Sequence, residues 1–302
     1  MAFRNPVLPL ALDAVYTAAA PFVWRKMKKK ERLRGTSPER ADQFFTRHLG
    51  KDVPPVGTPE DIRCWLHAVS VGESVAAGAL FRQLKNQRPQ WDYLVTTTTE
   101  TGQKQARESL KTADRFAYAP YDHGICVRRF LHHYRPSLYC FFETEFWPNL
   151  LLELGRRQTP VFLVNGKLSE KSAKAYARFR FLFRPPLLTP TRYFMQTDDD
   201  AERLRTIIGA HPGIRVSGNL KFDALPNPIS PEERLEWRTR WGIKPDELLF
   251  TAGSTHPTEE ALMLRAFAEA RQRVPNLRLM LVPRHPERFS EVAELITSAG
   301  HP

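Results

Sequence analysis

From residue 61 onward the chain alternates between short apolar stretches, typical of buried strands, and longer stretches with a helical pattern, at intervals of about 25–30 residues. This alternation predicts βαβ units, in which helices form right-handed crossovers between parallel strands. We therefore expect an α/β fold with a parallel sheet. The predicted strands are 62–69, 92–98, 115–119, 137–143, 160–165, 192–197 and 214–218, with helices between them, for example 73–87 and 122–133.

A proline-containing segment, residues 223–233, interrupts the alternation and predicts an interdomain linker. Beyond it the pattern resumes for only two strand–helix units. Two parallel strands leave the edges of their sheet unpaired, so we interpret this second domain as truncated. The predicted organisation is an N-terminal membrane-associating segment (1–40), a first domain (41–222), the linker, and an incomplete second domain (234–302) with strands 248–252 and 277–282 and helices 257–273 and 286–298.

The net charge of +12 is concentrated in two windows, 25–40 and 156–184, each with eight lysine and arginine residues. Such local basicity is typical of proteins with a polyanionic partner. The first window follows a mostly apolar segment from Pro6 to Trp24. Because a cleaved signal peptide carries its positive charge before the apolar stretch, we expect instead a helix anchored at the cytoplasmic leaflet of a membrane. An ordinary helix packed on the first domain is the alternative.

Several other classes of function lack support in the sequence. Residues 167–188 interleave cations with aromatic side chains, but no RNA- or DNA-binding signature accompanies them, so we favour a lipid interface. No G-x-G-x-x-G follows a predicted strand, which argues against a nicotinamide cofactor. The three cysteines have no C-x-x-C spacing, and Cys64 and Cys140, which lie in apolar strand-like runs, are interpreted as buried residues of a protein in a reducing compartment. We interpret Asp198–Asp200 as helix-capping residues, and we expect no metal and no cofactor.

Residues 65–74 run from a predicted strand directly into Gly72, Glu73 and Ser74, where a helical pattern begins. The carboxylate of Glu73 would thus lie just beyond the carboxyl end of a strand, the edge at which parallel sheets bind ligands. Glu73 can act there as a general base. The same spacing fits a capping box, in which Glu73 reaches back to the backbone amide of Ser70. Both roles remain open at this point.

Three further turns place charged side chains at predicted strand ends. Residues 143–148 (Glu-Thr-Glu-Phe-Trp-Pro) put two carboxylates beside a tryptophan. Residues 253–260 and 283–288 both place His-Pro after a strand, with a glutamate close behind. A purely structural explanation of these two turns is that each begins a helix with proline at its first position. Free amides, hydroxyl groups and Arg284 at helix N-termini also suit a phosphate site, which is the interpretation we favour.

Together these segments resemble the 3-deoxy-D-manno-octulosonic acid (Kdo) transferases of lipopolysaccharide synthesis. The resemblance rests on motifs that follow the family's order along almost the whole chain. They are HAVSVGES (67–74), TTTTETG (96–102), YAPYD (118–122), ETEFWPNL (143–150), NGKLSEKSAKAY (165–176), SGNLKFD (217–223), GSTHPTEE (253–260) and LVPRHPERF (281–289).

The resemblance implies a GT-B fold, in which two Rossmann-like domains with parallel sheets face each other across a cleft. It implies metal-independent, inverting transfer of Kdo from CMP-Kdo to the lipid A precursor lipid IVA at the cytoplasmic face of the inner membrane. The implied partners are CMP-Kdo, lipid IVA and anionic inner-membrane lipids, with no nucleic acid. The implied residues are Glu73 as catalytic base, Ser70, Gly72, Glu145 and Lys167 for the acceptor, and Lys221, Gly253, Ser254, Thr255, Arg284 and His285 for the donor.

One departure from the family pattern is Lys167, where arginine is usual, because lysine lacks the planar fork that binds an oxyanion with two hydrogen bonds. Three alternatives to the transferase remain open. The first is a non-catalytic fragment that binds lipid A or the membrane, and the second is a GT-B enzyme that uses a different sugar nucleotide. The third and weakest is a basic nucleic-acid-binding protein, which would bind nucleic acid with a steep salt dependence.

Overall fold

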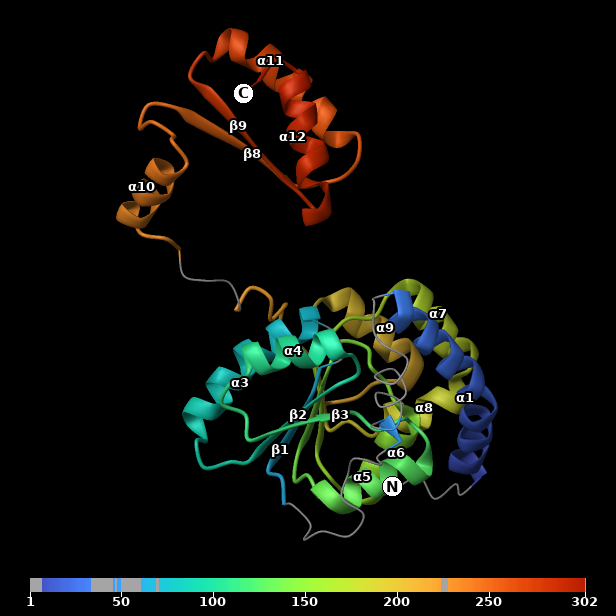
Figure 1. Cartoon of the computed structure of the whole chain (residues 1–302). Helices are drawn as coiled ribbons and strands as arrows, with labels where there is room; N and C mark the ends of the chain where they lie inside the picture. The colour runs from blue at the N-terminus through green and yellow to red at the C-terminus, as the bar shows by residue number, and fades with distance from the viewer. Residues whose placement is uncertain are drawn as a thin grey trace. The chain divides into compact units, whose positions relative to one another are not determined.

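The computed structural model describes residues 7–33, 46, 48–49, 61–68, 71–223 and 228–301. It divides into two compact units, Met1–Leu225 and Pro226–Pro302, each with its own parallel sheet (Figure 1). The boundary between the units falls inside the segment predicted as a linker.

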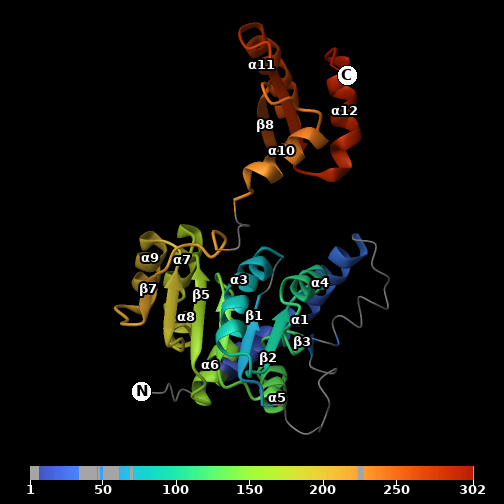
Figure 2. The same cartoon turned by 90° about the vertical axis from the view of Figure 1, so that its left-hand side faces the viewer.

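The first unit is built on a seven-stranded sheet with the strand order β3-β2-β1-β4-β5-β6-β7, and all neighbouring strands are parallel. Figure 2 shows β7 and β3 at opposite edges and β1 between them. The α/β fold with a parallel sheet is therefore confirmed, and each strand predicted in this part of the chain overlaps an observed one. The strands are β1 (Cys64–His67), β2 (Tyr93–Thr97), β3 (Arg115–Tyr118), β4 (Tyr139–Phe142), β5 (Val161–Gly166), β6 (Arg192–Met195) and β7 (Ile214–Val216).

Helices cover both faces of this sheet, and each face has its own hydrophobic core. Side chains of α3 and α4 pack on one face, and side chains of α5 to α9 pack on the other. The chain changes face after β3, so the connections diverge on either side of the β1–β4 pair. The helices are α3 (Val71–Gln87), α4 (Glu100–Ser109), α5 (Gly124–Tyr134), α6 (Pro148–Arg156), α7 (Glu170–Arg178), α8 (Arg180–Leu187) and α9 (Asp198–Ile208).

The two central strands, β1 and β4, are buried along their whole length. On one face Trp65 packs against Phe130 and Tyr139, with ring centroids 4.9 and 4.4 Å apart. On the other face lie Cys64 and Cys140. Both are buried, as predicted, and both are free thiols, as is Cys126 in α5. Large apolar side chains on both faces thus hold the strands that carry the proposed site.

The N-terminal helix α1 (Val7–Leu33) packs against α6 (Figure 1). Its segment Val7–Lys26 has a mean hydropathy of 1.5 and meets the length and composition expected of a membrane span. Leu12 is buried, whereas Leu10 and Phe22 are 69% and 73% exposed. The helix therefore contacts the first unit along one side and presents apolar side chains on another.

The second unit pairs β8 (Leu248–Thr255) in parallel with β9 (Leu277–Pro283), at the positions that the sequence predicts. Three helices accompany the pair: α10 (Pro231–Arg240), α11 (Glu259–Arg273) and α12 (Phe289–Ser298), the last preceded by the 3-10 turn η1 (Pro286–Arg288). Helix α10 starts inside the predicted linker 223–233. Ser230 and Glu233 form a capping box there, which fixes the helix start despite the surrounding prolines.

Candidate functional site

Glu73 lies in the first turn of α3, immediately after the central strand β1, and is only 4% exposed. Gly72 precedes it in the same helix. Ser70 lies outside the described residues, so the alternative capping-box role of Glu73 stays a prediction. The location nevertheless fits the requirement for a general base, because the carboxylate stands at the carboxyl end of a strand where the crossovers diverge.

Glu145 lies in the turn that follows the neighbouring strand β4. Its Oε2 accepts a hydrogen bond from the indole Nε1–H of Trp147 at 3.1 Å. Burial raises the pKa of Glu145, while this hydrogen bond opposes the change. The turn begins at Glu143, whose φ of 56° is in the left-handed region. This conformation is typical of a tight turn, and the chain turns there directly after the strand.

Tyr139, at the start of β4, is buried opposite Trp65 in the β1–β4 pairing. Burial raises the pKa of its phenol, and the charges of Asp122 and Glu145 raise it further, with a smaller contribution from Glu73. The phenol of Tyr139 is therefore neutral near pH 7.

His67, the last residue of β1, lies beside these groups and was not singled out from the sequence. It is 1% exposed, its Nδ1 lies 2.9 Å from the hydroxyl of Thr96, and its ring packs edge-on against Trp147 at 5.5 Å. Burial lowers the pKa of His67 to about 4, so the imidazole is neutral near pH 7. Among the described residues its Nε2 has no hydrogen-bond partner. The signal in the sequence that could have identified His67 is its position at the end of an apolar predicted strand.

Strand β5, on the other side of β4, leads into Lys167, which is exposed. Asn165 near the end of this strand has a φ of 55°, and its Oδ1 accepts a hydrogen bond from the Leu220 amide at 3.0 Å. This bond holds the turn that carries Lys221 on the first unit. The predicted donor-side residues are therefore divided between the units, because Gly253 and the residues that follow it belong to the second.

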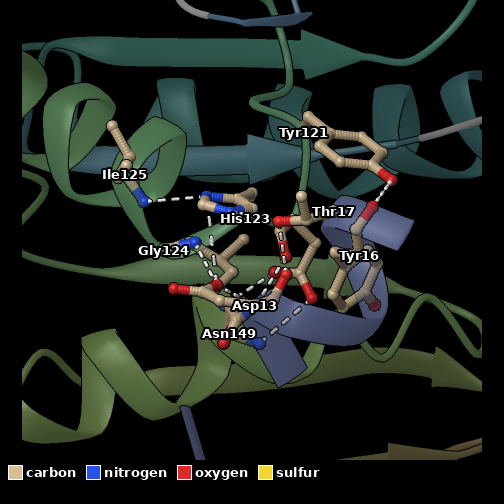
Figure 3. A network of polar contacts seen from close by, with 10 residues as sticks. Asp13, Tyr16, Thr17, Tyr121, His123, Gly124, Ile125 and Asn149 are labelled. Carbon is tan, nitrogen blue, oxygen red and sulfur yellow. Dashed lines mark hydrogen bonds and ion pairs between the residues drawn. The ribbon is translucent and has the colours of Figure 1, made fainter. Parts of the chain in front are cut away.

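A network of polar contacts joins α1 to this part of the first unit (Figure 3). The carboxylate of Asp13 accepts hydrogen bonds from the amide of Gly124 at 2.7 Å and the side chain of Asn149 at 3.1 Å. Thr17 lies 3.1 Å from Nε2 of His123, and the Tyr121 hydroxyl donates to the backbone of Tyr16. Asp13 and Thr17, two polar residues in the apolar part of α1, thus make contacts with the rest of the first unit.

Asp122 lies at the centre of this region. Its two carboxylate oxygens accept hydrogen bonds from the backbone amides of Leu150 at 2.8 Å and Asn149 at 3.0 Å, at the start of α6. Burial nevertheless raises the pKa of Asp122 to about 7. The sequence includes Asp122 in the YAPYD motif but does not reveal that it anchors a helix.

In the second unit the turns after β8 and β9 meet at one edge of the sheet. Ser254 has a φ of 59° at a shift in the strand register, and the amide of Arg284 donates to the carbonyl of Thr255 at 2.9 Å. Arg284 and His285 are exposed, whereas Thr255 is buried and its hydroxyl donates to Glu260 at 2.8 Å. The structure therefore brings Gly253, Ser254, Thr255, Arg284 and His285 together.

Over the described ranges, no group of three or more His, Cys, Asp or Glu side chains could hold a metal ion. Asp198–Asp200 form the first turn of α9, and the side chain of Thr197 caps this helix. Asp200 also accepts a hydrogen bond from the amide of Leu168 at 2.8 Å. The predicted helix start is therefore confirmed, but Thr197 is the capping residue, and the three aspartates lie in the first turn, where negative charge stabilises the helix dipole.

Solved structures with similar folds include UDP-GlcNAc 2-epimerase from Neisseria meningitidis, with a TM-score of 0.54, 14% sequence identity, and coverage of 78% of this chain and 70% of that one. At this level of identity the similarity concerns the fold alone. It confirms that the chain is an α/β protein of the GT-B type.

The model of the 3-deoxy-D-manno-octulosonic-acid transferase (Kdo transferase) family matches residues 28–224. The chain therefore belongs to this family, as the motifs predict. It is 33% identical to the 3-deoxy-D-manno-octulosonic acid transferase of Haemophilus influenzae over 232 residues, 77% of this chain and 54% of that protein. The enzyme of the same name from Bordetella pertussis is 31% identical over 299 residues, 95% of this chain and 67% of that protein. The chain thus spans little more than half of the first relative's length.

Proposed function

We propose that the protein is an inverting glycosyltransferase of lipopolysaccharide synthesis that transfers Kdo from CMP-Kdo to the lipid A precursor lipid IVA. The observation that carries this proposal is the position of Glu73, buried in the first turn of α3 beside the β1–β4 pair. Family membership supports the type of transferase, and the motifs carry the choice of donor and acceptor.

The chemistry follows from the positions of the side chains. Glu73 accepts the proton of the acceptor hydroxyl as its oxygen forms a bond with the anomeric carbon of Kdo. The bond from that carbon to the phosphate oxygen breaks, and CMP leaves with the bonding electrons. Ser254, Arg284 and His285 are the groups proposed to stabilise the departing phosphate. This scheme assigns each reacting proton and charge to a residue of the chain and calls on no metal ion.

The acceptor-side proposal concerns Glu145, Lys167 and the first turn of α3, with Ser70 and Gly72. Lys167 is exposed and can pair with a phosphate of the lipid A precursor. Glu145 is half-buried and can accept hydrogen bonds from sugar hydroxyl groups. We further propose that the first unit works at the cytoplasmic face of the inner membrane.

The membrane proposal rests on two surfaces. Helix α1 exposes Leu10 and Phe22. In α8 the side chain of Phe181 is 78% exposed, and this residue belongs to the basic segment 156–184. Apolar side chains together with cations suit the interface of an anionic bilayer. The polar contacts of Asp13 and Thr17 with the first unit favour a helix that lies against the protein in its N-terminal part.

The test is Kdo transfer from CMP-Kdo generated in situ to lipid IVA, comparing the 302-residue chain with its Glu73→Gln variant. Loss of a general base lowers the rate by about 10²–10⁴-fold. The matched control is Glu232→Gln, since Glu232 is also a first-turn glutamate but is exposed and outside the family motifs. Transfer that is unaffected in Glu73→Gln contradicts the proposed base. If the parent chain binds lipid IVA without transferring Kdo, a non-catalytic acceptor-binding protein is supported instead.

A further inference from the structure

The turn after β9 contains two arginines with different surroundings. Arg284 is exposed, and its guanidinium has no hydrogen bond or ion pair with the part of the chain that the structure describes. Arg288 is held on two sides. Its nitrogens contact the two oxygens of Glu260 at 2.7 and 3.1 Å, and those of Glu291 at 3.1 and 3.3 Å. Of these two arginines, only Arg284 therefore has a guanidinium that is free to bind an incoming anion.

Glu260, in the first turn of α11, is 1% exposed, and its carboxylate is fully engaged. It forms a two-point ion pair with Arg288 and accepts the Thr255 hydroxyl at 2.8 Å. The hydrogen bonds from Arg288 are the main cause that lowers the pKa of Glu260 to about 2, so this carboxylate is ionised near pH 7. A buried carboxylate of this kind is tolerated only with such partners.

The Glu260–Arg288 pair connects the two turns of the proposed donor site. Glu260 follows β8, whereas Arg288 ends the 3-10 turn after β9. The two turns also share the hydrogen bond from the Arg284 amide to the Thr255 carbonyl. The ion pair, Thr255 and this backbone bond form a continuous set of contacts that links the turns of Ser254 and Arg284. The distance between these two ligand-side residues thus depends on the pair.

We infer that Arg288 and Glu260 are positioning residues for the donor phosphate, while Arg284 contacts the phosphate itself. The inference rests on the donor site proposed above and deepens it. It separates two arginines that the sequence places in the same motif. Because the planar guanidinium makes two parallel hydrogen bonds with Glu260, lysine at position 288 retains the charge but loses the fixed geometry.

The experiment measures binding of CMP, the leaving group, to the full chain by titration calorimetry. Arg288→Lys and Glu260→Gln are expected to weaken binding about tenfold or more. The matched control is Glu291→Gln, which removes the other partner of Arg288. Since Glu291 is 65% exposed and lies on α12, it does not join the two turns, and CMP binding should change less than about twofold. Thermal melting of each variant establishes that the protein compared is folded.

A double-mutant cycle distinguishes positioning from general support of the fold. Arg284→Ala alone should abolish most CMP binding. In the Glu260→Gln background Arg284 is already misplaced, so the same substitution should cost far less. The side chain of Glu260 bonds Thr255 and Arg288 and makes no hydrogen bond or ion pair with Arg284, so this non-additivity would have to arise through placement of the turn. Arg288→Lys provides a second background should Glu260→Gln fold poorly.

Two results would overturn the inference. One is a pair of variants that melt at lower temperature yet bind CMP like the parent chain, with additive effects in the cycle. That outcome leaves the proposed function intact and reduces the ion pair to a support of the fold. The other is a parent chain that binds no CMP, which refutes the donor site and the inference together.

Discussion

The carboxylate of Asp13 accepts a hydrogen bond from the backbone amide of Gly124 at 2.7 Å, and this bond links the N-terminal third of α1 to the first residue of α5. The approach is close because position 124 has no side chain. A Cβ atom there would lie 2.6 Å from Oδ2 of Asp13. The glycine thus provides both the donor and the space for its acceptor.

Gly124→Ala is therefore expected to displace Asp13 and weaken the docking of α1. Overpacking of this kind costs about 1–3 kcal/mol of unfolding free energy. Urea denaturation measures this loss, with Ile125→Ala as the control, since Ile125 is the adjacent residue and 65% exposed. An unchanged unfolding free energy in Gly124→Ala would mean that α1 shifts without losing contacts.

Asp122 predicts a pH dependence of stability. Burial raises its pKa from 3.8 to about 7, so between these values the folded state holds a proton that the unfolded state has lost. Its contribution to the unfolding free energy is full below about pH 4 and declines as the pH rises towards 7. Asp122→Asn does not titrate at this position. Urea denaturation at pH 4.5 and 7.5 should therefore show the parent chain losing more stability than the variant, by up to about 1.4 kcal/mol per unit of pKa difference.

An equal loss of stability in parent and variant would contradict this expectation. It would mean that the amides of Asn149 and Leu150, which lower the pKa of Asp122, outweigh its burial. The two terms act on the same carboxylate in opposite directions. The measurement therefore determines which of them dominates.

Trp147→Phe tests the role proposed for Glu145. The substitution keeps an aromatic ring beside His67 but removes the N–H group that donates to Glu145 at 3.1 Å. A hydrogen bond to a charged group contributes about 1.5–3 kcal/mol, so the KM for lipid IVA should rise roughly tenfold or more. Affinity for CMP should not change. A fall in kcat with constant KM would instead place Glu145 at the reacting atoms.

Phe22→Ser tests the proposed membrane surface of α1. Removing a phenyl group that enters the bilayer interface costs about 1.5–3 kcal/mol, so binding to vesicles with anionic phospholipids should weaken by about 10- to 100-fold. Phe222→Ser is the matched control, because Phe222 is 75% exposed and lies in the turn after β7, outside α1 and α8. Flotation of the vesicles with the bound protein provides the measurement. Equal losses in the two variants would contradict a specific role for α1.

The sequence predicts the α/β fold because strand length and helical period are local properties. The sequence also carries a signal for the start of α10, because Ser230 and Glu233 have the spacing of a capping box. The prolines around these residues nevertheless favoured the prediction of a linker. Strand β8 continues to Thr255, beyond the predicted end at 252, because pairing with β9 resumes after the register shift at Ser254. Such pairing depends on a strand later in the chain.

The polar network of α1 lies beyond prediction for the same reason. Asp13 in an apolar segment argues against a simple membrane span, but nothing near it in sequence identifies Gly124 and Asn149 as its partners. Likewise, Arg284 and Arg288 occupy equivalent positions in a basic turn until Glu260 is placed beside one of them. The motifs thus identify which residues lie together at a site. Only the tertiary contacts distinguish the residues proposed to contact a ligand from those that position them.

Glu143 and Asn165, at the ends of β4 and β5, couple engineering of stability to function. Both hold φ values near 55°, which most side chains adopt only at a cost of about 1–2 kcal/mol. A thermostabilisation programme would therefore select both positions for glycine. At position 165 this change removes the side-chain oxygen Oδ1 that accepts the hydrogen bond from the Leu220 amide. At position 143 it loosens the turn that carries Glu145. The simplest gains in stability would thus come from the strand ends that carry the proposed acceptor residues Glu145 and Lys167 and hold the turn of the proposed donor residue Lys221.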